Sequence, residues 1–205
     1  MNEKYNEVVR AAFEQIIHER DIDHLIHFTD IRNLSSILEN GILPYKDLVA
    51  HKTVHGYGNG DVRADGNLDA NCCSVQHPNW GLFSSKQGRT KADYAFLILS
   101  TDIILNKRCS FYPENAAKGW MSRAPVKKYS HSWAFEAMFD DTTGKDREGL
   151  DKNMTTDPSA EVHVFGKIEP EYIEEIVIEN QTLKNSYAKK HPDFMFVDFW
   201  PEQWI

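Results

Sequence analysis

HLIHFTDIRNLSSILENG, residues 24–41, is the stretch that decides the predicted fold. Its first six residues favour a short strand. Apolar residues of the following segment recur at helical spacing: Ile31, Leu34, Ile37 and Leu38. Gly41 then supplies the usual stop signal just after a helix. The sequence therefore predicts a strand joined tightly to a helix at Thr29-Asp30.

The rest of the chain alternates between short strands and short helices. Residues 5–20 carry apolar side chains at helical spacing, which predicts an amphipathic N-terminal helix. Strands are predicted where residues alternate in polarity or stay apolar: 72–75, 94–100, 109–112, 161–165 and 175–178. Helical turns are predicted at 102–105, 132–139 and 168–176, and loops at 49–71 and 140–158. The segment from 181 onward is predicted to be a polar connection to an aromatic C-terminus.

Composition places all these elements in one domain. The chain has 205 residues, 41% of them hydrophobic and 26% charged, which is enough for one substantial core and short for two. A disordered or collagen-like chain is thereby excluded. Strands mixed with short helices, without regular βαβ units, predict the α+β class. We expect a single domain over 1–205, with an N-terminal helix at 1–20, a core at 24–178 and a C-terminal extension at 181–205.

Neither a membrane segment nor a disulfide framework is expected. The longest apolar run, at 94–99, is far shorter than the roughly 20 residues that a membrane span needs, and the N-terminus is polar and charged. The cysteines Cys72, Cys73 and Cys109 are odd in number, and the adjacent pair misses the CxxC spacing of a zinc site. We therefore expect structural cysteines, no metal and a cytoplasmic protein.

Charge is distributed unevenly along the chain. The net charge of −8 argues against a polyanionic partner, but the segment 86–128 holds nine basic and three acidic residues. Aromatic residues of the types on which unstacked bases sit are interleaved with those cations. Composition alone leaves two interpretations open: a nucleic-acid surface, or a solvated basic face over core aromatics.

Two polar residues stand out in the predicted strands. His27 lies just before the strand–helix turn, where helix N–H donors can converge on a phosphate or ribose. Glu161 is the first residue of the strand 161–165 and follows Asp157-Pro158. A strand mouth suits a catalytic carboxylate, whereas an edge-protecting charge is the ordinary alternative. For His27 the ordinary alternative is a hydrogen-bonded structural residue.

Two separated blocks of the chain resemble one family. IHFTDIRNLSSILENGIL at 26–43 and DPSAEVHVFGKIEPEYI at 157–173 resemble, in this order, the DarT family of nucleic-acid ADP-ribosyltransferase toxins. Four intervening segments are similar to the branch of that family closest to its guanine-modifying members: 63–70, Ser74 with 77–80, Phe111 with 115–117, and 135–139. The resemblance covers residues 24–178.

The resemblance implies a mono-ADP-ribosyltransferase fold, a split antiparallel sheet with peripheral helices that grips NAD as a substrate and needs no metal. It implies catalytic roles for Glu161 and Arg63. The residues that it implies for NAD binding are His27, Phe28, Thr29, Asn33, Gly41, Ser74 and Trp80. The residues that we expect to bind nucleic acid are Asn153, Met154, Thr155, Thr156, Arg123, Lys127 and Lys128.

The implied reaction is transfer of ADP-ribose from NAD to a base of single-stranded DNA, with release of nicotinamide. Guanine is the favoured base and thymine the second. Two alternatives stay open: an enzyme of the same fold that modifies RNA bases, and a non-catalytic module that binds NAD or ADP-ribose. A toxin of this family is also expected to have a cognate antitoxin and a role in phage defence.

Overall fold

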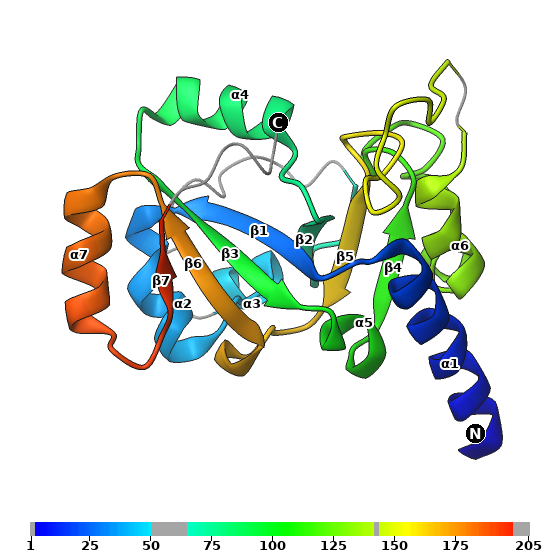
Figure 1. Cartoon of the computed structure of the whole chain (residues 1–205), viewed down its shortest axis with the longest axis horizontal. Coiled ribbons are helices and arrows are strands. Elements are labelled where there is room, and N and C mark those ends of the chain that lie inside the picture. The colour runs from blue at the N-terminus through cyan, green and yellow to red at the C-terminus, as the bar shows by residue number, and fades with distance from the viewer. Residues whose placement is uncertain (1–2, 51–64, 142–143, 199–205) are drawn as a thin grey trace.

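The computed structural model describes residues 3–50, 65–141 and 144–198. A seven-stranded sheet crosses the described part of the molecule in the order β4-β5-β2-β1-β3-β6-β7 (Figure 1). Its strands are β1 (His24–Asp30), β2 (Ala70–Val75), β3 (Tyr94–Ser100), β4 (Cys109–Tyr112), β5 (Glu161–Phe165), β6 (Ile173–Ile178) and β7 (Phe196–Val197). Neighbouring strands are antiparallel except β6 and β7, which are parallel. The predicted α+β class is confirmed.

Helices cover the faces and both ends of this sheet. They are α1 (Glu3–Arg20), α2 (Leu34–Asn40), α3 (Tyr45–Ala50), α4 (Trp80–Thr90), α5 (Asp102–Asn106), α6 (Ser132–Glu136) and α7 (Gln181–Lys190). Short 3-10 turns span Ile31–Asn33, Val126–Tyr129, Ala137–Phe139 and Pro170–Tyr172. In Figure 1, α1 and α6 lie near β4 at one end of the sheet and α7 lies near β7 at the other. No helix in the described ranges is long and apolar enough to cross a membrane.

Strand alternation divides the buried side chains between two faces of the sheet. Leu25, Leu97 and Val162 belong to the larger core, to which α1, α2 and α6 contribute. Ile26 and Phe96 point the other way, into a smaller apolar cluster that contains side chains of α4. The central strand β3 is buried on both faces, as its apolar run predicts. Because β5 alternates in the same way, its odd-numbered residues face away from the larger core.

The sheet splits between β1 and β2. Only two residue pairs join these strands, Leu25 with Val75 and Ile26 with Ser74. Beyond them β1 pairs with β3 alone, whereas the first four residues of β2 pair with β5. Past the last backbone pair, a side chain joins the two strands instead: His27 Nδ1 donates to the carbonyl of Cys72 over 2.9 Å. This confirms the predicted split antiparallel sheet and places His27 at the split.

Gly41 ends α2 as the sequence predicts, and the reason is a close backbone approach. Its φ is +82°, in the region that glycine tolerates best, and an added Cβ would clash with the carbonyl oxygen of Ile168. The next residue, Ile42, exchanges two backbone hydrogen bonds with Ile168, of 2.8 and 3.0 Å. Gly41 thereby joins the end of α2 to the segment after β5.

The predicted loop at 49–71 is too long by two residues at each end. The helix α3 extends to Ala50, and β2 begins at Ala70. The helix α4 was not predicted, because its large apolar residues, Trp80, Leu82 and Phe83, are confined to its first turn and the rest of the helix is polar or glycine. Its start is instead fixed by the side chain of Asn79, which accepts a hydrogen bond from the N–H of Leu82 over 2.9 Å.

The polar connection predicted from 181 onward is wrong, because this segment forms α7 and the additional strand β7. Asn180 caps α7, since its Oδ1 accepts hydrogen bonds from two backbone N–H groups. Leu183 and Tyr187, four residues apart, pack one side of the helix against the larger core. Three apolar residues in ten, Leu183, Tyr187 and Ala188, were too weak a pattern to predict a helix from the sequence.

Candidate active site

Glu161 lies at the beginning of β5, on the face turned away from the larger core. Its side chain accepts three hydrogen bonds. Asn115 Nδ2 donates to Oε1 over 2.9 Å, the N–H of Ala116 donates to Oε2 over 3.3 Å, and His163 Nε2 lies 3.1 Å from Oε2. The residue is only 8% exposed, so these donors replace water around the carboxylate. The carboxylate is thereby held in one orientation.

His163, like Asn115, is a partner of Glu161 that sequence reasoning missed. It is fully buried and lies opposite Cys72 of β2 in the sheet register, on the same face as Glu161. Its Nε2 is 3.3 Å from Cys72 Sγ, and its Nδ1 is 3.1 Å from Asn67 Nδ2. Burial lowers the pKa of His163, but the Cys72 sulfur and the Glu161 carboxylate outweigh burial and raise the pKa above its usual value. The available signal was the period-two pattern Glu161-Val-His163.

Two of the implied NAD-binding residues form a pair next to the split. The amide of Asn33 donates to the hydroxyl of Thr29 over 3.0 Å, and both side chains are buried. Thr29 is two residues beyond His27 along β1. His27 in turn contacts the Cys72 carbonyl, and the Cys72 sulfur contacts His163. The structure therefore connects His27 to Glu161 through β2.

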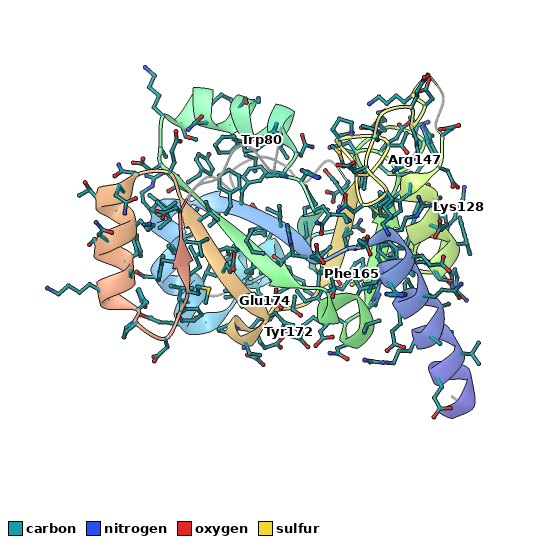
Figure 2. The ribbon with its side chains drawn as sticks, in the orientation of Figure 1. Trp80, Lys128, Arg147, Phe165, Tyr172 and Glu174 are labelled. Carbon is teal, nitrogen blue, oxygen red and sulfur yellow. The ribbon has the colours of Figure 1, made fainter. Side chains whose placement is uncertain are left out.

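Phe28 and Trp80 belong to the aromatic cluster between the sheet and α4. Phe28 packs against Phe83 at a centroid distance of 5.7 Å, and Trp80 packs against Phe83 and Phe96 at 5.6 and 5.7 Å. Figure 2 shows Trp80 at the α4 side of the sheet. Ser74 is buried two residues beyond Cys72 on β2, so its side chain shares the Cys72 face. These three residues lie on the Glu161 face of the sheet.

Hydrogen bonds from Arg147 hold the loop that precedes β5. Its guanidinium donates to the carbonyls of Met154 and Asp151 over 2.6 and 2.7 Å and to the hydroxyl of Thr156 over 3.1 Å. Thr156 is buried. The hydroxyl of Thr155 donates to the carbonyl of Asp157 over 3.0 Å.

Asn153 and Asp157 complete the anchoring of this loop. The side chain of Asn153 donates to the carbonyl of Asp21 over 3.3 Å. Asp157 is 2% exposed, accepts hydrogen bonds from Ser159 and pairs with Lys145 over 2.8 Å. Burial raises the pKa of Asp157, but Lys145 and Ser159 outweigh burial and lower it. Several side chains that we expected to meet nucleic acid therefore also hold the loop in shape.

The model of the DarT family, described as ssDNA thymidine ADP-ribosyltransferase, matches residues 26–198. The chain belongs to the DarT family. The predicted family is confirmed, and with it the enzyme class of NAD-dependent ADP-ribosyltransferases. The match continues through α7 and β7, beyond residue 178, where we expected the resemblance to end. No curated protein matches the chain.

Solved DarT structures share the fold at low sequence identity. Thermosipho africanus DarTG in complex with ADP-ribose has a TM-score of 0.56 and 17% identity, over 86% of this chain and 50% of that one. Thermus sp. 2.9 DarT has a TM-score of 0.54 and 14% identity in complex with carba-NAD+, over 89% of this chain and 98% of that one. In complex with ADP-ribosylated ssDNA it has a TM-score of 0.55 and 14% identity, over 90% and 97%. This chain spans half the length of the DarTG chain.

In this DarT-family chain, three cations expected to bind nucleic acid lie between β4 and α6. Arg123, Lys127 and Lys128 are all exposed. Two tryptophans, Trp120 in the same segment and Trp133 in α6, are 57% and 55% exposed. We call these five residues the basic-aromatic surface. Figure 2 shows Lys128 at the same end of the molecule as the loop residue Arg147.

A small pocket lies next to β4 and is lined mainly by residues that follow this strand. Its lining includes Asp65, Asn67, Tyr112 and Ala116, and its volume is about 240 Å³ including open solvent. Ala116 is also a hydrogen-bond donor to Glu161. Arg63, the other residue implied to be catalytic, lies outside the described residues.

Proposed function

We propose that this chain transfers ADP-ribose from NAD to a base of single-stranded DNA, with Glu161 as the catalytic carboxylate. The observation that carries this proposal is the Glu161 carboxylate itself, oriented by three donors and connected through β2 to His27 at the split. The Thermus relative is known in complex with carba-NAD+ and with ADP-ribosylated ssDNA, which supports both substrates.

The role of Glu161 follows from the charge that develops during transfer. NAD supplies the ADP-ribosyl group and nicotinamide is the leaving group. Positive charge grows on the ribose as that bond breaks, and a carboxylate next to the ribose stabilises it electrostatically. Because Asn115, Ala116 and His163 already fix the carboxylate, little reorganisation is needed at the moment of reaction.

The residues around the split suit the binding of NAD. His27 offers an imidazole, and Thr29 and Asn33 offer a hydroxyl and an amide next to it. The aromatic cluster with Phe28 and Trp80 provides an apolar wall on the Glu161 face. Such a wall excludes water, which would otherwise hydrolyse NAD. Arg63 keeps its proposed catalytic role.

The DNA strand is proposed to run from the basic-aromatic surface to the loop 153–160. The cations supply affinity for phosphates without reading the sequence, and exposed aromatic rings stack unpaired bases. A base must leave its stack before its edge can reach the site. The loop, which Arg147 holds in place directly before Glu161, is proposed to select that base.

The identity of the base is the finer part of the proposal. Sequence resemblance favours guanine, whereas the family description names thymidine. RNA bases are the second candidate substrate, and a non-catalytic NAD-binding module is the alternative without chemistry. A cognate antitoxin also belongs to the proposal, supported by the DarTG relative of the same fold.

The experiment incubates the purified chain with isotope-labelled NAD and five substrates: single-stranded DNA oligonucleotides that hold either one guanine or one thymine, a matched RNA of each, and a duplex. Mass spectrometry then detects the added ADP-ribose, and fragmentation locates it. We expect modification of single-stranded DNA at one of the two bases and none of the duplex. Modification of RNA alone would replace the DNA proposal, and NAD binding without any transfer would favour the binding module.

A further inference from the structure

His163 is buried at a position where the surrounding sequence is apolar. It is 0% exposed, and its neighbours Val162 and Val164 belong to the larger core on the opposite face. A buried imidazole costs free energy unless its nitrogens find partners. Both nitrogens do, since Nδ1 meets Asn67 and Nε2 meets Glu161 and Cys72. Packing alone would be served as well by an aliphatic residue.

The contact with the Glu161 carboxylate identifies the imidazole nitrogen that donates. A carboxylate only accepts, so His163 Nε2, next to Glu161 Oε2, carries the hydrogen; in the neutral imidazole Nδ1 then accepts from Asn67 Nδ2. That hydrogen points to Glu161 Oε2 at 3.1 Å, with Cys72 Sγ at 3.3 Å as a second acceptor. In the charged imidazolium Nε2 carries a hydrogen too. The donor to Glu161 is therefore present in both charge states of His163.

We propose that His163 is a positioning residue of the transfer reaction: its Nε2–H holds the Glu161 carboxylate in the orientation that meets the ribose. This inference rests on the proposed function. His163 is not a catalytic residue in this account, because a fully buried side chain acts through Glu161 rather than on the substrate. The Cys72 contact fixes the imidazole from β2, the strand to which His27 of β1 is also bound.

Two variants of His163 separate positioning from packing. His163→Leu removes the donor and keeps an apolar side chain of similar size, whereas His163→Gln keeps an N–H donor near the place of Nε2. We expect His163→Leu to lower kcat roughly ten- to hundredfold, the usual range for one hydrogen bond to a charged group, with KM for NAD changed less than about threefold. His163→Gln should recover most of kcat.

The matched control is Val164→Ala, on the same strand and equally buried but on the opposite face. It should lower the melting temperature and leave kcat of the folded protein unchanged. A double variant adds a second test. In a Glu161→Gln background, His163→Leu should not lower the residual rate further, because residues that act as a unit are not additive.

Nuclear magnetic resonance of the imidazole nitrogens reads the contact without any activity. We expect a protonated Nε2 in the wild type and a changed Nε2 signal in Glu161→Gln. An unprotonated Nε2, a normal kcat in His163→Leu, or an equal loss of rate in both backgrounds would overturn the proposal. If the wild type shows this Nε2 signal but transfers nothing, the proposed function fails, and with it the role in transfer, while the contact itself stands.

Discussion

The two halves of the sheet are built from different side chains. The half formed by β1, β3 and β6 buries mostly apolar side chains, and β3 is buried from Tyr94 to Leu99; its buried polar side chains, such as Thr29, lie on β1. The half formed by β4, β5 and β2 buries polar residues in the same pleated positions, among them Ser110, His163 and Glu161. The split between β1 and β2 separates the halves. The apolar core extends across this junction, whereas the Glu161 carboxylate with its donors lies on one side of it and His27 with Thr29 on the other.

The polar half remains stable because its buried groups are paired within the protein. Asn71 donates to the carbonyls of Ile42 and Gly166 over 3.2 and 2.9 Å, and Ser110 lies 3.1 Å from the hydroxyl of Ser130. Each such bond offsets the cost of removing a polar group from water. Satisfied polar networks also specify one arrangement of side chains. The polar half thus combines apolar burial, as at Val162 and Val164, with a fixed geometry around Glu161.

The largest effect is expected from a substitution in the polar half that removes catalysis and leaves the fold intact. Glu161→Gln keeps the size of the side chain and its ability to accept from Asn115, but it removes the negative charge. We expect the rate of ADP-ribose transfer to fall roughly a thousandfold. The melting temperature should change by only a few degrees, and NAD binding, measured by calorimetry, should persist. Near-normal transfer would remove Glu161 from the mechanism.

The reverse experiment weakens the apolar half. Leu99 is 0% exposed in β3, where it pairs with Leu25 of β1. We expect Leu99→Ala to lower the free energy of unfolding by about 2–5 kcal/mol, measured by urea denaturation. At a temperature where the variant is folded, kcat should equal that of the wild type. A matching fall in kcat would show that the two halves are not independent.

The sequence predicted the apolar half better than the site. Strongly patterned segments such as β3 and β4 were predicted with the bounds that the structure has, because their apolar pattern matches their burial. The helices α4 and α7 were missed, since a single capping asparagine and few apolar residues define each of them. The local pattern of apolar residues therefore indicates which segments are buried, but it says little about helices whose start depends on one polar capping residue.

Within the site, the position of Glu161 at the beginning of a strand left an edge-protecting charge as the ordinary alternative, and only the family resemblance implied a catalytic role; its partners were not predicted. Asn115 and His163 reach it only because β4, β5 and β2 pair in one register. Cys72 and His163 are 91 residues apart in the chain. Sequence periodicity assigns a residue to a face of a strand and does not say which residue of another strand lies opposite.

A smaller effect is expected in the loop that precedes β5. Asp157→Asn keeps the acceptor for Ser159 and removes the ion pair with Lys145, which should cost about 1 kcal/mol at neutral pH. The folded pKa of Asp157 is lowered, so its stabilisation is complete above the unfolded pKa of about 3.9 and is lost as the pH falls through the folded value.

Thermal melts from pH 7 down to pH 3 test this prediction. The difference in melting temperature between wild type and Asp157→Asn should shrink as the pH falls below about 4. A difference that stays constant over the whole range would show that the carboxylate charge does not stabilise the loop.

The smallest effect is expected at the basic-aromatic surface. Replacing both Lys127 and Lys128 by Ser should weaken binding of single-stranded DNA several-fold at low salt, about equally for all sequences. The slope of log K against log salt should become shallower by roughly 0.7 for each phosphate that the protein no longer neutralises. The control exchanges Lys189 and Lys190, which are exposed on α7 at the other end of the sheet (Figure 1). Both double variants change the net charge equally. An equal change of slope in both would show that the basic-aromatic surface is only a solvated basic face. A change confined to Lys127 and Lys128 would place the DNA at the polar half of the sheet.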